Sequence, residues 1–381
     1  MYQFSNTLNA IVKPTLACNL RCKYCYYQHT NYDSQKMSIE TLKKFCDITF
    51  PHFKQVLIVW HGGEPTICSE KRLIQYIEIV KEKSKEYNLK NIQQNIQTNG
   101  TNLSDNLVKH FKFHNISVGI SYDGLKNEYL RYSTKKVQES MLIIKKYKLP
   151  TRAIAVISNV NCDNLISEYE HFKTNQINVK FSPYEDIDSF YTNLKISSKK
   201  YSENMKKLFQ YWINDKNCYI RVDPFCSMIC DYFNGFSSLC SRNSCMKRWV
   251  GINPNGDIYP CGKLTNITPY GNVNNLDDIR EIYNSKSFLF LLEKSIIRRE
   301  KCKNNCEIYK FCEGGCNYDA MRTSGIENND GFDCQIFKEL FTYIINFVDK
   351  QKLFQHLECI KNPVLFKSLQ KLNKKVTLRA F

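Results

Sequence analysis

The sequence lacks any apolar run long enough to cross a membrane. A spanning helix needs roughly 18 or more consecutive apolar residues, and runs such as residues 288–292 and 343–348 suit buried helices instead. The N-terminus, residues 1–10, has no charged region followed by an apolar one, so it contains no export signal. Internal repeats and low-complexity tracts are also absent. These absences favour a globular, cytoplasmic protein.

A long basic arm is missing too, although the chain is strongly basic. Its 381 residues include 54 Lys and Arg against 37 Asp and Glu, a formal net charge of +17. Such a charge favours acidic partners, such as nucleic acid, an anionic membrane or an acidic peptide. The basic residues are scattered, however, and the clearest stretches, at residues 199–200 and 371–375, are short. We interpret the excess as a Lys-rich solvated surface and expect no nucleic-acid and no membrane partner.

Cysteine, by contrast, is abundant, with 18 residues. In an exported protein these would form a disulfide framework, but without an export signal they predict thiols that bind metal in a reducing or anaerobic setting. Eleven of them fall into two spaced groups. We expect the remainder to be mainly small buried apolar groups; these are Cys46, Cys68, Cys162, Cys218, Cys226, Cys230 and Cys359.

The first group is the triplet Cys18, Cys22 and Cys25. Three thiolates at this spacing can hold three irons of a [4Fe–4S] cluster and leave the fourth iron open, whereas ferredoxin-type centres use four cysteines. An open iron can bind a substrate or a cofactor. The alternatives are a zinc knuckle or chance clustering, and the aromatic Tyr26 directly after the last cysteine disfavours both.

A CxxxCxxC motif followed by an aromatic residue resembles the signature of the radical S-adenosylmethionine (SAM) enzymes. The resemblance implies that the open iron binds the amino and carboxylate groups of SAM. An electron from the cluster would then cleave SAM to methionine and a 5′-deoxyadenosyl radical, which abstracts a hydrogen atom. The cofactor carries the difficult chemistry, and the protein supplies binding, orientation and exclusion of water. An external one-electron reductant of the flavodoxin or ferredoxin type is implied as a partner.

The order of apolar and polar segments predicts an α/β fold. Residues 1–185 alternate short β-branched runs with helical patterns, which indicates βαβ units and a parallel sheet. The predicted strands are residues 10–15, 55–60, 92–97, 116–121, 152–157 and 178–181, and the predicted helices are residues 39–49, 70–86, 104–112, 135–146 and 164–174. Six strands are too few for a closed eight-stranded barrel. We therefore predict a partial (β/α)6 barrel with its site at the C-terminal ends of the strands.

Composition divides the chain into four predicted segments. Residues 1–185 would form the radical SAM core, and residues 186–235 a bridging region with a helical pattern at 201–213. Residues 236–335 are rich in Cys, Gly and Asn and have few long periodic segments, which indicates a small iron–sulfur module whose folding free energy comes partly from metal ligation. Residues 336–381 return to helical patterns, the clearest at 336–347.

The motif Gly62-Gly63-Glu64-Pro65 follows the second predicted strand. Glycine lets the backbone approach a ligand closely, and Glu64 adds a carboxylate. In radical SAM enzymes a GGEP motif at this place holds the amino group of SAM, so the resemblance gives these four residues that role. Taken alone, Gly-Gly-x-Pro is an ordinary turn.

Polar residues also end the third and fourth predicted strands. The resemblance places SAM-contacting groups there and nominates Thr98, Asn99 and Ser121, with Arg131 for the SAM carboxylate. The alternative is a pair of ordinary Asn-Gly and Asp-Gly turns.

The second group of cysteines lies between residues 240 and 334. Cys245 and Cys261 enclose an Asn-Gly pair that predicts a β-hairpin, and the glycines between Cys312 and Cys316 permit a tight wrap. The pattern resembles the SPASM extension of radical SAM enzymes, which binds two auxiliary [4Fe–4S] clusters. The resemblance assigns Cys240, Cys245, Cys261 and Cys316 to the first cluster, and Cys302, Cys306, Cys312 and Cys334 to the second.

One spacing departs from this pattern, because three residues instead of two separate Cys302 and Cys306. With eight ligands, neither auxiliary cluster would have an open iron. Without Cys240, the first would have an iron that a substrate thiol could occupy. The alternative for the whole region is one or more structural zinc sites.

Enzymes of this group mostly modify peptides or proteins. Residues 60–66 and 97–101 resemble anaerobic sulfatase maturases, which oxidise Cys or Ser to formylglycine. Those enzymes carry an Asp as base directly after the cysteine that corresponds to Cys261, where this chain has Gly262. Two-electron oxidation needs a proton acceptor near the substrate, and the sequence does not identify this catalytic base.

We therefore expect a maturase of a ribosomally made peptide that forms a thioether or related cross-link. Sulfatase maturation and a non-enzymatic iron–sulfur electron carrier or regulator are the alternatives. Few residues precede Cys18, so we expect leader recognition to use the core, the basic surface or a separate leader-binding protein.

Overall fold

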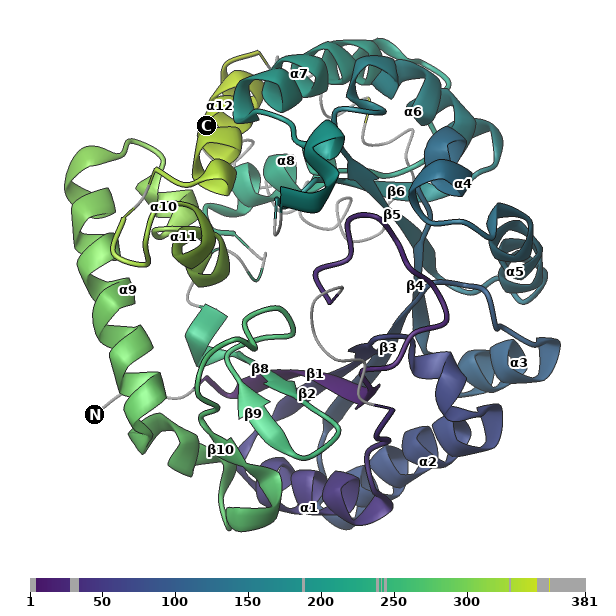
Figure 1. The fold of residues 1–381 in the computed structure, drawn as a ribbon, viewed down its shortest axis with the longest axis vertical. Helices are drawn as coiled ribbons and strands as arrows, with labels where there is room; N and C mark the ends of the chain where they lie inside the picture. The colour runs from purple at the N-terminus through teal and green to yellow at the C-terminus, as the bar shows by residue number, and fades with distance from the viewer. Residues whose placement is uncertain are drawn as a thin grey trace, which may run out of the picture. The chain divides into compact units, whose positions relative to one another are not determined.

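A computed structural model describes residues 5–27, 34–186, 189–237, 240, 242, 245–328, 330–347 and 356. The chain forms two compact units (Figure 1). Unit 1 contains residues 1–122, 127–151 and 244–294, and unit 2 contains residues 123–126, 152–243 and 295–381. No helix within the described residues is long and apolar enough to cross a membrane.

Four parallel strands form the centre of unit 1. They are β1 (Thr7–Thr15), β2 (Gln55–Gly62), β3 (Asn91–Thr98) and β4 (Ser117–Ser121). Each pairs with the next in parallel, with Val12 opposite Trp60 and Trp60 opposite Ile96. Because the strands are parallel, their C-terminal ends meet at one edge of the sheet.

A hairpin from late in the sequence extends this sheet on the other side of β1. Its strands are β8 (Trp249–Ile252) and β9 (Asp257–Tyr259), joined through Asn255 and Gly256 as predicted. β8 pairs in parallel with β1, and β10 (Gly271–Asn272) pairs antiparallel with β9. The sheet order in unit 1 is therefore β10-β9-β8-β1-β2-β3-β4.

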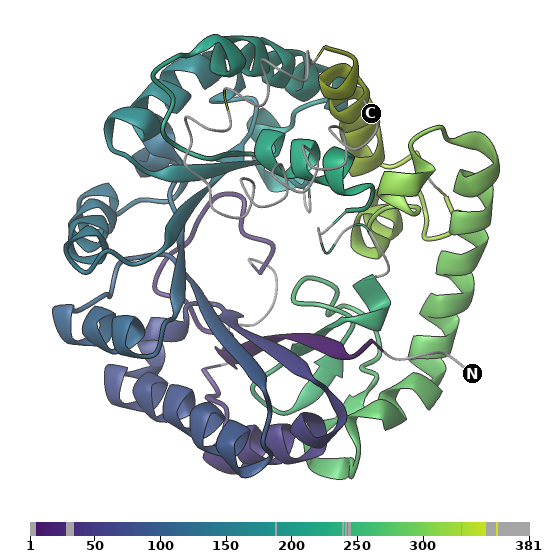
Figure 2. The same ribbon diagram turned by 180° about the vertical axis from the view of Figure 1, so that it is seen from behind.

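Serine residues begin the principal helices of unit 1. The helices are α1 (Ile39–Thr49), α2 (Glu70–Glu86), α3 (Asp105–Phe113), α4 (Asn127–Leu130) and α5 (Thr134–Lys146). The side chains of Ser38, Ser69 and Ser104 accept hydrogen bonds from the first turns of α1, α2 and α3, which satisfies N–H groups that have no partner within the helix. Figures 1 and 2 show α1, α2 and α3 on one face of the strands.

The core of unit 1 lies between these helices and the sheet. Ala10, Val12, Ile58 and Trp60 on the strands are fully buried, and so is Phe45 of α1. Each buried side chain of this size contributes about 1.5–3 kcal/mol. This apolar layer fixes the strands whose ends carry the predicted site.

Unit 2 has a smaller parallel sheet and more helix. Its strands β5 (Thr151–Ile157), β6 (Asn178–Pro183) and β7 (Val222–Asp223) pair in parallel. Its helices are α6 (Leu165–Thr174), α7 (Ser198–Asn214), α8 (Phe225–Asn234), α10 (Tyr309–Cys312), α11 (Asn317–Thr323) and α12 (Phe332–Phe347), with most of α9 (Lys286–Asn305).

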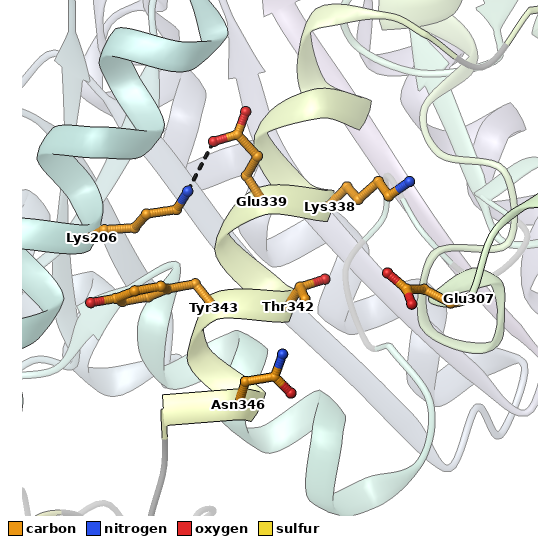
Figure 3. Close-up of a pocket in the computed structure, with 7 residues that line it drawn as sticks. All are labelled: Lys206, Glu307, Lys338, Glu339, Thr342, Tyr343 and Asn346. Atoms are coloured by element: carbon orange, nitrogen blue, oxygen red, sulfur yellow. Dashed lines mark hydrogen bonds and ion pairs between the residues drawn. The ribbon is translucent and has the colours of Figure 1, made fainter.

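Helices α7 and α12 pack side by side and border a hollow of about 610 Å³. Figure 3 shows its lining, in which Lys206 and Glu339 form an ion pair of 3.0 Å. The ring of Tyr343 lies edge-on to Phe209 at 6.2 Å and anchors α12 to α7. None of the predicted site residues lines this hollow.

The structure confirms the α/β class, the six predicted strands and the predicted helices, with boundary shifts of a few residues. Residues 236–335 contain the 20-residue helix α9, which includes the apolar run at residues 288–292. Its predicted apolar run is only partly buried: Phe288 and Leu291 are buried, but Leu289 and Phe290 are about half exposed. The divisions at residues 185, 235 and 335 remain predictions.

Candidate functional site

The Gly62-Gly63-Glu64 backbone lies against the segment that leads into Cys18. Gly63 N donates to the Thr15 carbonyl at 3.1 Å, and Glu64 N donates to the Ala17 carbonyl at 2.9 Å. A Cβ atom on Gly63 would lie 2.1 Å from the Ala17 oxygen, which leaves no room for any side chain. Glycine at this position is therefore what allows the ends of β1 and β2 to approach each other.

Glu64 is buried and accepts hydrogen bonds on both carboxylate oxygens. Thr66 donates to Oε1 through its N–H and its hydroxyl, at 3.1 and 2.7 Å, and Thr98 Oγ1 donates to the same oxygen at 2.7 Å. Asn99 N donates to Oε2 at 2.6 Å. Burial raises the pKa of Glu64, while these donors act to lower it. They hold the carboxylate in one orientation and stabilise its ionised form, which is the form that binds an ammonium group.

Asn99 connects this carboxylate to the cysteine triplet. Its Nδ2 donates to Asn19 Oδ1 at 2.8 Å and lies 3.8 Å from Cys18 Sγ, also as a donor. The loop after β1, the GGEP motif after β2 and the polar end of β3 are thus joined by direct contacts.

Arg131 reaches the triplet from α4 and the loop after it. Its Nη1 donates to the Tyr24 hydroxyl at 2.6 Å, and the guanidinium lies over the Tyr24 ring. Its positive charge lowers the pKa of Cys18 and of Cys25, against the larger upward effect of burial. A cation here favours thiolates and could also bind a carboxylate.

Ser121 and Pro65 occupy supporting positions. Ser121 ends β4 and accepts a hydrogen bond from Gln97 Nε2 at 2.9 Å. Pro65 begins the short helix η2 (Pro65–Cys68), for which Glu64 is the N-cap. The structure therefore brings Cys18, Glu64, Thr98 and Asn99 into one hydrogen-bonded group, whereas Ser121 contacts Gln97 of β3.

The donor set of this group fits a cluster with an open iron and an amino-acid ligand. Three cysteine thiols lie on one loop, an oriented buried carboxylate stands beside them, and a guanidinium lies close by. A carboxylate and a guanidinium are complementary to the two charged groups of an α-amino acid.

Four thiols of unit 2 form a separate group. Cys302 lies in α9, Cys306 follows it, Cys312 ends α10 and Cys334 lies in α12. The pKa of Cys334 rises to about 12, first through burial and then through the negative charges of the other three thiolates. Thiols that repel one another's ionisation lie close together, and a bound metal reverses the effect. These residues fit a four-thiolate iron–sulfur site.

Buried arginines surround this second group. Arg298 is fully buried and donates through Nε to the Gly314 carbonyl at 2.7 Å, and through its other nitrogens to Ile326 O and Asn317 Oδ1. Gly314 and Gly315 have φ angles of +84° and +72°, which side chains rarely adopt. The predicted tight wrap between Cys312 and Cys316 is thus built by glycines and held by Arg298.

The cysteines assigned to the first auxiliary cluster are divided between the units. Cys245 and Cys261 lie in unit 1, where Leu264 N donates to Cys261 Sγ at 3.4 Å. Cys240 and Cys316 lie in unit 2, and Cys240 is exposed. Of the other cysteines, Cys230 is half-buried and Cys359 lies outside the described residues. The rest are buried as expected; these are Cys46, Cys68, Cys162, Cys218 and Cys226.

Sequence profiles match two parts of the chain. The profile of the radical SAM superfamily matches residues 12–166, and that of the SPASM iron–sulfur cluster-binding domain matches residues 240–312. The chain contains a radical SAM domain. It carries a SPASM domain, and the cofactors of these domains are SAM, its associated [4Fe–4S] cluster and auxiliary clusters.

Known radical SAM proteins resemble the chain over most of its length. It is 26% identical to the cysteine-type anaerobic sulfatase-maturating enzyme of Clostridium perfringens over 88% of this chain and 96% of that protein. It is 25% identical to the serine-type enzyme of Bacteroides thetaiotaomicron over 92% of each. These relatives indicate that the chain is a maturase.

Two solved structures share the fold. Native anSMEcpe with bound AdoMet has a TM-score of 0.79 and 22% identity, and the match covers 92% of this chain and 99% of that chain. Streptococcus suis SuiB bound to precursor peptide SuiA has a TM-score of 0.62 and 18% identity, covering 86% and 76%.

Sequence reasoning missed several side chains of this radical SAM protein. Lys13 is fully buried on β1 and donates to Asn253 Oδ1 at 2.9 Å; burial lowers its pKa to about 7. The Tyr27 hydroxyl donates to the Gly262 carbonyl at 3.0 Å. A lysine in a strand shortly before the cysteine motif, and a second aromatic after it, were the available signals. Arg242, which contacts Cys312, had no such signal.

Proposed function

We propose that this radical SAM enzyme is a maturase that forms a thioether or related cross-link in a ribosomally made peptide. A thioether forms from one C–H and one S–H group with the loss of two hydrogens. When bound, SAM and its reduced cluster would supply the radical that removes one hydrogen atom. The thiol would lose its proton, and an oxidised auxiliary cluster would take up the remaining electron.

Known complexes support a peptide as substrate. The solved relatives include native anSMEcpe with AdoMet and the Kp18Cys peptide, and SuiB with its precursor peptide SuiA. The basic surface of the present chain, with a net charge of +17, would favour an acidic leader or peptide.

The residues of unit 1 would perform the binding steps. Cys18, Cys22 and Cys25 would hold the SAM-associated cluster, and Glu64, fixed by Thr66, Thr98 and Asn99, would bind the amino group of SAM. Gly62, Gly63 and Pro65 would shape this turn. Arg131 would bind the SAM carboxylate, and Ser121 would line the same strand end. The second cysteine group would hold the auxiliary clusters, with the ligand sets that the sequence predicts.

The observation that carries the cross-linking proposal is the environment of Gly262. Sulfatase maturases have an aspartate base at this place. A Cβ atom on Gly262 would lie 3.0 Å from Ile11 Cγ2 and 3.2 Å from its Cδ1, so Ile11 already fills the space beside this backbone. The site thus has no carboxylate at this position, and a side chain there would require Ile11 to shift by a few tenths of an ångström.

Sulfatase maturation remains the second candidate function. The similarity to both cysteine-type and serine-type maturating enzymes, over 88% and 92% of this chain, favours it. Under this alternative, another group must replace the missing aspartate as proton acceptor.

One experiment separates the two functions. The anaerobically reconstituted enzyme is incubated with SAM, a reductant and either a sulfatase-type Cys peptide or a Cys-rich precursor encoded nearby, and 5′-deoxyadenosine and peptide mass are measured together. Loss of hydrogens in pairs from the precursor is the expected result. Replacement of the sulfur by an aldehyde oxygen in the Cys peptide would contradict the proposal and establish sulfatase maturation.

A further inference from the structure

A buried arginine lies against the second thiol group of unit 2. Arg242 is only 7% exposed, and its Nη1 donates to Cys312 Sγ at 3.8 Å. Its guanidinium stacks on the Phe337 ring, 3.9 Å from the centroid. Two contacts hold this side chain in place, one with a sulfur atom and one with the face of an aromatic ring.

The surroundings leave space for this contact. A Cβ atom on Gly315 would lie 3.6 Å from Arg242 Nη1 and 3.9 Å from Cys312 Sγ, both ordinary contact distances, so Gly315 lies close to the guanidinium and to the sulfur.

A cation and an N–H donor at a cluster sulfur have a definite effect on electron transfer. Reduction adds one negative charge to an iron–sulfur cluster, and hydrogen bonds to its sulfurs and nearby charge stabilise the reduced form. The effect is large in a buried setting because the local dielectric constant is low. Arginine stays protonated at all relevant pH values, so its contribution does not vary with pH.

We infer that Arg242 raises the reduction potential of the auxiliary cluster held by Cys302, Cys306, Cys312 and Cys334. With the arginine in place, this cluster accepts electrons more readily than it would without it. The inference rests on the proposed function, which places a cluster on these four cysteines. Arg242 is a positioning and tuning residue, because it acts through the ligand Cys312. It also lies two residues after Cys240 in the chain, so its segment belongs to one cysteine set while its guanidinium contacts the other.

The test is a redox titration of the auxiliary clusters, followed by electron paramagnetic resonance, in a background where Cys18, Cys22 and Cys25 are alanine. Arg242→Met keeps the length and the contact with Phe337 but removes charge and donor. We expect the ratio of reduced to oxidised second cluster at fixed potential to fall at least about tenfold, a shift of about 59 mV for one electron. Arg242→Lys keeps the charge. We expect its cluster to have a reduction potential between that of Arg242→Met and that of the wild type.

Lys338→Met is the matched control. Lys338 follows Phe337 on α12 but is exposed, so solvent and salt screen its charge. We expect the ratio of reduced to oxidised cluster at fixed potential to change by less than about twofold. An equal shift in Lys338→Met and Arg242→Met would show a general charge effect and overturn the inference, as would an unchanged potential in Arg242→Met.

Cluster content separates this inference from the proposed function. If Cys312→Ala loses no iron relative to its parent, the cluster assignment itself is wrong. If Cys312→Ala loses about four irons while Arg242→Met keeps its iron and its potential, the assignment stands and the role of Arg242 falls. Loss of the cluster in both Arg242→Met and Arg242→Lys would make Arg242 an assembly residue and would also overturn the tuning role.

Discussion

The two thiol groups differ in how the chain presents them. Cys18, Cys22 and Cys25 lie on one short loop after β1 in unit 1, next to an oriented carboxylate. The thiols of the second group (Cys302, Cys306, Cys312 and Cys334) come from three helices and a connecting loop of unit 2, next to arginine side chains. A compact loop with a polar ligand beside it suits a cluster that must bind another molecule. A set of four thiols held by several helices suits a cluster that only exchanges electrons.

Removing one cysteine ligand from each thiol group gives the largest expected effect. If the two groups were equivalent, both removals would have the same effect on SAM cleavage and the comparison would fail. Cys22→Ala should lower SAM cleavage by more than about 100-fold, because loss of a residue that binds the iron directly has a larger effect than loss of an outer hydrogen-bond partner. Cys306→Ala should leave SAM cleavage in place but abolish turnover of the peptide. The measurements are 5′-deoxyadenosine release and iron content; equal loss of cleavage in both variants would contradict the division.

Glu64→Gln sharpens the role of the carboxylate. It keeps the shape of the side chain but removes the charge that would pair with the SAM ammonium group. A hydrogen bond to a charged group contributes about 1.5–3 kcal/mol, so the dissociation constant of SAM should rise about 10- to 100-fold in equilibrium dialysis. Glu70→Gln is the control, because Glu70 contacts Ser104 and Asn106 on the helix side. A SAM affinity unchanged by Glu64→Gln would refute the assignment.

Gly262→Asp probes the space next to Cys261. The new side chain would press on Ile11, and overpacking of this kind costs about 1–3 kcal/mol, so the melting temperature should fall. Ile11→Ala creates room, and the double variant should recover part of the loss. The double-mutant cycle measures this coupling in thermal unfolding. Strict additivity of the two single changes would show that Ile11 does not fill the position.

The smallest expected effect concerns a second buried carboxylate, in unit 2. Glu168 accepts a hydrogen bond from Leu125 N at 2.9 Å, and burial raises its pKa from 4.5 to about 7. The unfolded chain releases this proton more easily, so the stabilising contribution is complete below about pH 4.5 and is lost as the pH rises to about 7. Above pH 7, burial of the ionised Glu168 carboxylate lowers the free energy of unfolding by about 1–3 kcal/mol.

Glu168→Gln should therefore raise the melting temperature at pH 8 by about 2–4 °C or more and leave it nearly unchanged at pH 4. Circular dichroism melting at both pH values measures this. An equal shift at both would assign the effect to packing and not to ionisation.

The contrast between the two groups also explains what could be predicted. The strands of unit 1, the GGEP turn and the cysteine triplet all follow from local spacing, because each depends on residues close together in sequence. The contacts of Glu64 with Thr98 and Asn99 follow once parallel strand ends are known to meet. Arg242 and Arg298 could not be found in this way. Their partners lie 70 and 16–28 residues away, and only the folded chain brings them together.

Helix α9 shows the other limit. Its buried residues lie on one face, at Phe288, Leu291, Ser295, Arg298 and Cys302, but three of the five are polar, charged or cysteine, so the apolar pattern of the sequence shows only the run at residues 288–292. The role of Gly262 required the structure as well, because the sequence reveals the missing carboxylate but not the side chain of Ile11 that fills its place.

The parallel pairing of β8 with β1 constrains the order in which the protein can form as it leaves the ribosome. β1 ends at residue 15, but its partner on one side, residues 249–252, is synthesised only after β7 is complete. Until then the edge of β1 has open N–H and C=O groups beside Ala10 and Val12. A chain released between residues 223 and 249 would contain a finished β7 but an unprotected β1, the kind of edge that pairs with another chain and aggregates.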